Sequence, residues 1–243
     1  TVAPLAGGGF VVAWYGNGPG DNGGIFAQRY SASGVAQGSE VLVNSYLTNE
    51  QAYPAIAVFS DGGFVVTWMS WDQDGSRNGV YAQRYNAAGA AQGGEFPVNT
   101  YTASDQAYPA IAALKDGGFV VTWMSIGQDG DGGGVYARRY DASGVAQGGE
   151  FPINTTTGGD QGYPAVAALA DGGYIVAWHG NGPGDGGGVY AQRYDENGAP
   201  QGSELLVNTT TANDQSYPTI TALSDGGFVV TWTSVGQDGS SSG

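Results

Sequence analysis

Hydrophobic and polar residues alternate along short segments of this chain, a pattern typical of half-buried β-strands. In one such segment, residues 119–123 read Phe-Val-Val-Thr-Trp, so β-branched and aromatic side chains alternate between two faces. No stretch combines a 3.6-residue apolar period with helix-capping residues. The pattern therefore predicts an all-β protein without helices.

The same segments recur at intervals of 54 or 55 residues, which is the dominant feature of the sequence. Each repeat contains four predicted strands, at 109–114, 118–124, 135–140 and 150–154 in the third repeat. An Asp-Gly-Gly sequence separates the first two strands and supplies the left-handed residues of a tight hairpin. The repeated motif Gly-Gly-Phe-Val-Val-Thr-Trp, or a close variant, ends at Trp14, Trp68, Trp123, Trp178 and Trp232.

Four short strands in each repeat, joined only by local hairpins, predict a β-propeller of four-stranded antiparallel blades. A β-solenoid is the competing architecture, but its repeats are usually shorter. The first two strands occur five times and the last two only four times, so we expect five blades with the last incomplete. The single domain would span 1–243, with repeats at approximately 1–48, 49–103, 104–158, 159–212 and 213–243.

Composition excludes several classes of protein. The chain has no Cys, so it contains neither a disulfide framework nor a Cys-based zinc site. Lys and Arg number 7 against 22 Asp and Glu, giving a net charge of −15, which is the wrong sign for a nucleic-acid partner. No run approaches the ~18 apolar residues of a membrane-spanning helix.

The loops after the second strand of each repeat are rich in Asp and Gly. Three of them contain Gln-Asp-Gly and two read Gly-Asn-Gly-Pro-Gly-Asp. Carboxylate and carbonyl oxygens clustered in this way are typical ligands of Ca²⁺, although the same Asp-Gly and Asn-Gly pairs also form ordinary turns. The candidate Ca²⁺ ligands are Asp21, Asp72, Asp74, Asp129, Asp131 and Asp185.

The same loop face is the predicted binding surface for a carbohydrate or cell-surface ligand. Trp71 lies outside the repeat pattern and is the best candidate for an exposed aromatic side chain. The candidate ligand-binding residues are Trp71, Asp74, Asp129, Asp238, Asn17 and Asn181.

Other recurring residues are interpreted as structural. The periodic Trp residues, together with the Tyr that ends each third strand, are expected in the core between blades. The Arg before that Tyr is expected to pair with the Glu eleven residues later, across one hairpin of the same blade. His179 is the only His, and no Cys nucleophile, Gly-x-Ser-x-Gly motif, phosphate-binding loop or His cluster is present, so the sequence predicts no enzymatic activity.

The pattern DGGFVVTWxSxGQDG, GVYAQRYDASG, QGGEFxVNT and DQxYPAIAAL resembles the tandem repeats of very large secreted bacterial proteins. Such proteins often also carry hemolysin-type (RTX) calcium-binding nonapeptides or cadherin-like adhesion domains. The resemblance implies a secreted or cell-surface location in a calcium-rich setting. The nonapeptide itself is absent, so no residue is assigned to RTX-type calcium binding.

From these observations we expect a non-catalytic extracellular binding or adhesion module, lectin-like in its specific form. One alternative is a structural spacer or assembly repeat, in which another copy or the continuation of a longer chain completes the fifth blade. A second alternative is a glycoside hydrolase, because paired carboxylates cannot be recognised from the sequence alone.

Overall fold

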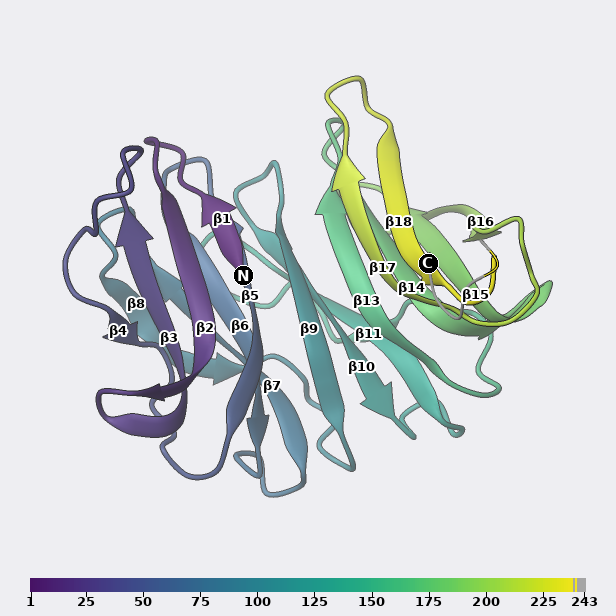
Figure 1. Ribbon diagram of the computed structural model, residues 1–243, viewed down its shortest axis with the longest axis horizontal. Helices are drawn as coiled ribbons and strands as arrows, with labels where there is room; N and C mark the ends of the chain where they lie inside the picture. Colours follow the sequence, from purple (N-terminus) through teal and green to yellow (C-terminus); the bar gives the residue numbers. More distant parts are fainter. Residues whose placement is uncertain (238, 240–243) are drawn as a thin grey trace.

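The computed structural model of the protein describes residues 1–237 and 239. All regular secondary structure in this part of the chain is β-strand. The strands form four antiparallel sheets of four strands and one sheet of two (Figure 1). Within each sheet the strands are neighbours in chain order, so hairpins make all the connections. The described residues include no helix long and apolar enough to cross a membrane.

The sheets match the sequence repeats, and we name them blades 1 to 4 and the half blade. Blade 1 consists of β1 (Val2–Pro4), β2 (Phe10–Gly18), β3 (Asp21–Tyr30) and β4 (Val41–Leu42). Blade 2 consists of β5 (Gln51–Val58), β6 (Phe64–Trp71), β7 (Asn78–Tyr85) and β8 (Ala91–Pro97). Blade 3 consists of β9 (Gln106–Ala113), β10 (Phe119–Ile126), β11 (Gly133–Tyr140) and β12 (Phe151–Pro152). Blade 4 consists of β13 (Gln161–Ala168), β14 (Tyr174–Gly182), β15 (Asp185–Tyr194) and β16 (Pro200–Leu206), and the half blade of β17 (Gln215–Ala222) and β18 (Phe228–Ser234).

The first strand of each blade lies innermost. Successive first strands contact one another, from β1 to β5, β9, β13 and β17, as expected of strands that line a common axis. This arrangement confirms the prediction of an all-β propeller with an incomplete fifth blade.

Large side chains of one blade pack against aliphatic and aromatic side chains of the preceding blade. In β6 and β10 the alternation places Trp68 and Trp123 on one face, where both are fully buried. Trp123 packs with Phe119 and Val121 against Val80 and other small residues of blade 2. The interblade core predicted for the periodic Trp residues is therefore confirmed for Trp68, Trp123 and Trp178, whereas Trp14 and Trp232, in the two terminal sheets, are only partly buried.

The Asp-Gly-Gly turns between the first two strands also follow the prediction. Gly117 has φ of +85°, a conformation that favours glycine. The carboxylate of Asp116 accepts a hydrogen bond from Gly118 N at 2.9 Å. A Cβ on Gly118 would lie 2.3 Å from the carbonyl oxygen of Tyr140, so the second glycine is required by close packing.

The predicted Arg–Glu pair within each blade is wrong. Arg84 instead donates to the carbonyl oxygens of Ala142 and Ser143, in a turn of the following blade. Glu150 accepts from the backbone N of Thr100, in the preceding blade, at 2.7 Å. Both charged side chains therefore bind backbone groups of neighbouring blades.

The half blade is attached to blade 4. Its Phe228 and Val230 pack against Leu169, Ile175 and Ala177 of that blade. No described residue pairs with the outer edge of β18. Completion of this blade by another copy or by a continuing chain stays a prediction.

Candidate functional site

Each inner strand from β5 onward contains a Tyr-Pro pair near its start, and the tyrosine has a strained backbone. Tyr53, Tyr108, Tyr163 and Tyr217 have φ of 54°, 54°, 51° and 52°. This left-handed conformation costs an L-residue about 1–2 kcal/mol. The pairing register with the second strand shifts at each pair, which marks a β-bulge. Strain retained at four equivalent positions is a reason to look for function there.

The four side chains form a row of aromatic rings at one end of the axis, which we call the tyrosine mouth (Tyr53, Tyr108, Tyr163 and Tyr217). Successive ring centroids are 4.9, 4.1 and 5.0 Å apart. The rings and their following prolines line an open cavity of about 300 Å³. Tyr53 and Tyr217, at the ends of the row, are 46% and 58% exposed, so their rings are accessible to a ligand.

The hydroxyl groups of Tyr53 and Tyr163 stay protonated at neutral pH because their pKa values are raised. The neighbouring Tyr108, burial and Tyr15 all raise the pKa of Tyr53. Interaction with the Tyr108 hydroxyl, burial and the other hydroxyls raise the pKa of Tyr163. Neutral phenols donate and accept hydrogen bonds, which suits hydroxyl groups of a ligand better than a charged group.

His179 lies at one end of the tyrosine mouth. Because no other blade has a His at this position, the mouth is not an exact repeat of one structure. Its ring stacks on Tyr163 with centroids 5.0 Å apart, and it contacts the ring of Tyr217 edge to face. The backbone N of Tyr217 donates to His179 Nδ1 at 3.1 Å, so a neutral ring carries its proton on Nε2. Burial lowers the pKa of His179, while Asp214 acts in the opposite direction. A neutral His with a free Nε2–H is a hydrogen-bond donor at the mouth.

An acidic residue precedes each tyrosine by three positions, at Glu50, Asp105, Asp160 and Asp214. Asp105 forms an ion pair with Arg77 at 3.1 Å, and Asp160 accepts from Gly133 N at 2.9 Å. The carboxylates of Glu50 and Asp214 make no hydrogen bond with any described residue. Asp214, whose charge acts on the pKa of His179, is therefore the acid best placed for chemistry.

Four of the predicted Ca²⁺ ligands have structural roles in their loops. Asp21, Asp74, Asp129 and Asp185 each accept a hydrogen bond from a backbone N two residues later. Asp21 and Asp185 also accept from Asn44 Nδ2 at 2.8 Å and Asn208 Nδ2 at 2.7 Å. The other carboxylate oxygens of Asp74 and Asp129 are buried without such a donor, and burial raises the pKa of Asp74.

The remaining predicted Ca²⁺ ligands are more exposed. Asp72 has φ of 58° at the tip of its loop, and Asp131 accepts from Gly159 N at 3.2 Å. Among residues 1–237 and 239, no group of three or more His, Asp or Glu side chains is arranged to hold a metal ion. Calcium binding stays a prediction.

The predicted ligand-binding residues do not form one site. Trp71 is 45% exposed, as expected, and its backbone N bonds to Glu50 O at 3.0 Å, near the rim of the tyrosine mouth. Asn17 is exposed at the end of β2. Asn181 has a structural role, since its Nδ2 donates to Gly158 O at 2.7 Å. Asp238 lies outside the described residues.

The sequence reasoning missed the tyrosine mouth, although one signal was present. The residue after each periodic Trp varies while its neighbours repeat, and this position contacts the mouth through Tyr15 and His179. Variation at an otherwise repeated position marks the place where symmetry is broken. The five residues are Tyr15, Met69, Met124, His179 and Thr233.

Solved structures of other proteins share this fold along nearly the whole chain. A protein of unknown function from Dyadobacter fermentans has a TM-score of 0.68 at 12% identity, covering 96% of this chain and 74% of that chain. An α-L-arabinofuranosidase from Fusarium graminearum, in complex with an iminosugar inhibitor, has a TM-score of 0.66 at 12% identity, covering 99% and 78%. An α-L-arabinanase from Penicillium chrysogenum, in complex with arabinobiose, has a TM-score of 0.63 at 17% identity, covering 95% and 73%.

Identities this low show the fold alone. No protein-family model and no curated protein matches the sequence. The resemblance to secreted bacterial repeat proteins, and the location it implies, therefore stay predictions.

The prediction of a non-catalytic adhesion module without enzymatic activity is wrong. It rested on the single His and on the absence of recognisable catalytic motifs from the sequence. The same fold supports an arabinofuranosidase and an arabinanase, so a propeller of this kind is compatible with catalysis. In addition, the blades differ from one another at the tyrosine mouth, where only one of them contributes a His.

Proposed function

We propose that this protein is a glycoside hydrolase that binds a neutral glycan at the tyrosine mouth and cleaves a glycosidic bond beside His179. The observation that carries the proposal is the row of four stacked tyrosine rings with exposed rings at its two ends. Aromatic faces stack on the apolar C–H faces of sugars, and phenol hydroxyls bond to sugar hydroxyls. The opening of about 300 Å³ is at the lower end of the usual range for ligand sites.

The proposed substrate contains arabinose. The arabinofuranosidase and the arabinanase with this fold were solved with an iminosugar and with arabinobiose, respectively, which supports a short glycan as the ligand. A neutral furanoside also fits an end of the protein where Glu50, Asp105, Asp160 and Asp214 would repel an anionic sugar.

Hydrolysis requires a group that protonates the leaving oxygen and a group that activates water. His179 Nε2–H would donate a hydrogen bond to the glycosidic oxygen and stabilise the charge that develops there as the C–O bond breaks, while keeping its own proton. The Asp214 carboxylate would accept a proton from the water whose oxygen bonds to the anomeric carbon. Transfer of that proton from Asp214 to the leaving oxygen would complete the hydrolysis and restore the carboxylate.

Release of reducing ends from α-1,5-arabinan and from arabinobiose tests this proposal, with sialyllactose as an anionic comparison. We expect turnover of the arabinosides, lowered about 10²–10⁴-fold in Asp214→Asn and in His179→Gln. Asp131→Asn is the matched control, because Asp131 is an exposed loop carboxylate that does not line the tyrosine mouth. An unchanged rate in Asp214→Asn, or no turnover of any arabinoside by the wild-type protein, would show that the proposal is wrong.

A further inference from the structure

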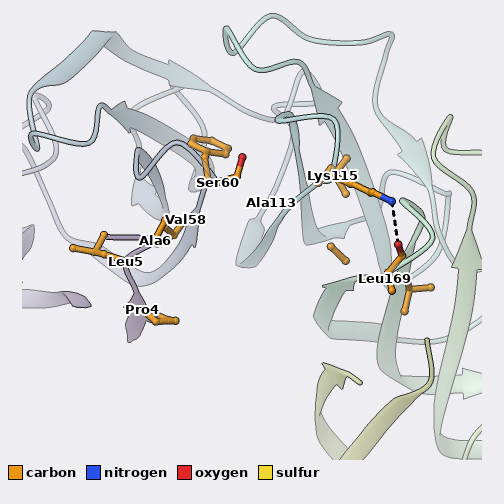
Figure 2. Close-up of a pocket in the computed structure, with 12 residues that line it drawn as sticks. Pro4, Leu5, Ala6, Val58, Ser60, Ala113, Lys115 and Leu169 are labelled. Carbon is orange, nitrogen blue, oxygen red and sulfur yellow. Dashed lines mark hydrogen bonds between the residues drawn. The ribbon is translucent and has the colours of Figure 1, made fainter. Parts of the chain in front are cut away.

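The opposite end of the axis holds a second cavity, which is larger than the tyrosine mouth. Its volume is about 520 Å³ (Figure 2). Its walls come from four blades, each contributing the end of its inner strand and the start of the following turn. We call it the Lys115 pocket, and it is lined by residues 4–6, 58–60, 113–115 and 168–170.

The walls of the Lys115 pocket are mainly aliphatic. Most of the lining residues are Ala, Leu, Val, Pro or Phe, because inner strands near the axis have room only for small or inward-folded side chains. Ser60 and Lys115 are the only lining residues with polar side chains. Such a surface favours the hydrocarbon part of a ligand, in contrast to the phenol-lined opening at the other end.

Lys115 breaks the repeat at the rim of this pocket. The equivalent turn position is Ala6, Ser60 and Ala170 in the other blades that line it. Lys115 is the only Lys in the chain. Figure 2 shows its side chain extending along the rim toward Leu169, and its Nζ donates to Ala170 O at 3.4 Å. That single long bond leaves two N–H donors of the ammonium group available.

Lys115 forms no ion pair with a described carboxylate of the surrounding turns, although Glu196 and Lys115 both lie close to Gly172. Asp116 lies 3.5 Å from Arg139, and Asp171 pairs with Arg193. No described carboxylate lies within 4.0 Å of Lys115 Nζ, since the ion pairs of this part of the chain involve only Arg. Although the net charge of the protein is −15, this apolar pocket has beside it a cation that forms no ion pair with a described residue.

We propose that the Lys115 pocket binds a small amphiphilic carboxylate of the medium-chain fatty acid class. The alkyl chain would occupy the aliphatic pocket, and the carboxylate would accept hydrogen bonds from Lys115 Nζ at the rim. Charge complementarity selects an anion over an alcohol or an ammonium compound with the same chain. This site is separate from the tyrosine mouth and does not depend on the proposed hydrolysis.

The single lysine provides a direct test by NMR with decanoate as the probe. Reductive methylation with ¹³C-formaldehyde labels only Lys115 and the N-terminal amine, and dimethyl-lysine keeps its charge. We expect decanoate, below its micelle-forming concentration, to shift the Lys115 signal saturably while the Thr1 signal stays in place. Decanol should bind more weakly than decanoate, and decyltrimethylammonium more weakly still.

Calorimetry with unlabelled protein provides the second readout. Lys115→Gln should weaken decanoate binding about three- to fivefold, as for a partly exposed ion pair, and leave decanol binding unchanged. Arg77→Gln is the matched control, because it removes an exposed cation in a loop of the other end. Absence of a saturable Lys115 shift, equal binding of decanol and decanoate, or an unchanged affinity in Lys115→Gln would overturn the proposal. Asp214→Asn should bind decanoate normally, so a failure here is distinguishable from a failure of the proposed hydrolysis.

Discussion

The two ends of the axis are built from the two ends of the same inner strands, yet they differ in chemistry. At the start of the strands, a β-bulge holds Tyr-Pro pairs in a left-handed conformation, and tyrosine rings line a polar opening. At the end of the strands, regular pairing continues to the turn, and aliphatic side chains line a larger pocket. The backbone irregularity is what separates them, because it redirects a large side chain from the sheet face to the opening.

The comparison also shows how a repeat protein obtains single sites. Both ends are built mostly from repeated residues. At each end one blade carries a residue type that the other blades lack, His179 at the tyrosine mouth and Lys115 at the pocket. Each substitution places a polar or charged group beside surfaces that the repeat supplies several times. Repetition thus builds the surface, and a single departure from it gives a particular blade its chemistry.

The largest expected effect comes from removing the core that both ends share. Trp123 is fully buried between blades 2 and 3, so Trp123→Ala should lower the free energy of unfolding by about 3–5 kcal/mol. Glycan and decanoate binding should both decline at temperatures where the variant unfolds. Chemical denaturation measures the change, and Trp71→Ala, at an exposed position, should alter stability little. Loss of binding at one end alone would contradict a shared core.

A smaller effect is expected at the pocket end alone. Gly118→Ala would place a Cβ 2.3 Å from the carbonyl oxygen of Tyr140, which must shift the turn that carries Lys115. We expect a loss of about 1–3 kcal/mol in unfolding free energy and weaker decanoate binding. Gly94→Ala is the control, since a Cβ there has no atom within 4 Å. Equal melting temperatures of the two variants would refute the close-packing argument.

At the tyrosine mouth, binding and stability should separate. Tyr53→Gly removes an exposed ring and relieves left-handed strain of about 1–2 kcal/mol, so we expect little loss of stability. Loss of stacking worth about 0.5–1.5 kcal/mol should weaken arabino-oligosaccharide binding about 2- to 12-fold. Calorimetry with both ligands checks this, and decanoate binding should not change. A large drop in melting temperature would mean that the strained tyrosine serves the fold instead.

The smallest effect is a pH dependence that belongs only to the tyrosine mouth. Burial holds the pKa of His179 below its usual value of 6.5, so the unfolded chain binds this proton more tightly than the folded protein. The resulting stability is present above pH 6.5 and is lost as the pH falls toward the folded-state pKa. Between pH 7 and pH 5 the melting temperature should therefore fall more for the wild type than for His179→Gln. Parallel curves of melting temperature against pH for the two proteins would show that His179 does not cause the pH dependence.

The sequence by itself determined the strands, their order and the number of blades. Alternation in segments such as 119–123, the Asp-Gly-Gly turns and the 54- or 55-residue period are local properties, and the structure confirms them. The burial of Trp68 and Trp123 was also predictable, because period-two alternation with large side chains on one face requires a partner surface.

Only the tertiary structure decided which residues meet at the axis. Tyr53 and Tyr217 are 164 residues apart in the sequence. No local sequence pattern shows that a β-bulge directs both side chains to the same opening. The same holds for Arg84, whose partners lie in the next blade, and for Lys115, whose pocket is lined by the inner-strand ends of four blades. Contacts between blades depend on how whole sheets stack, and this information is not present in any single repeat.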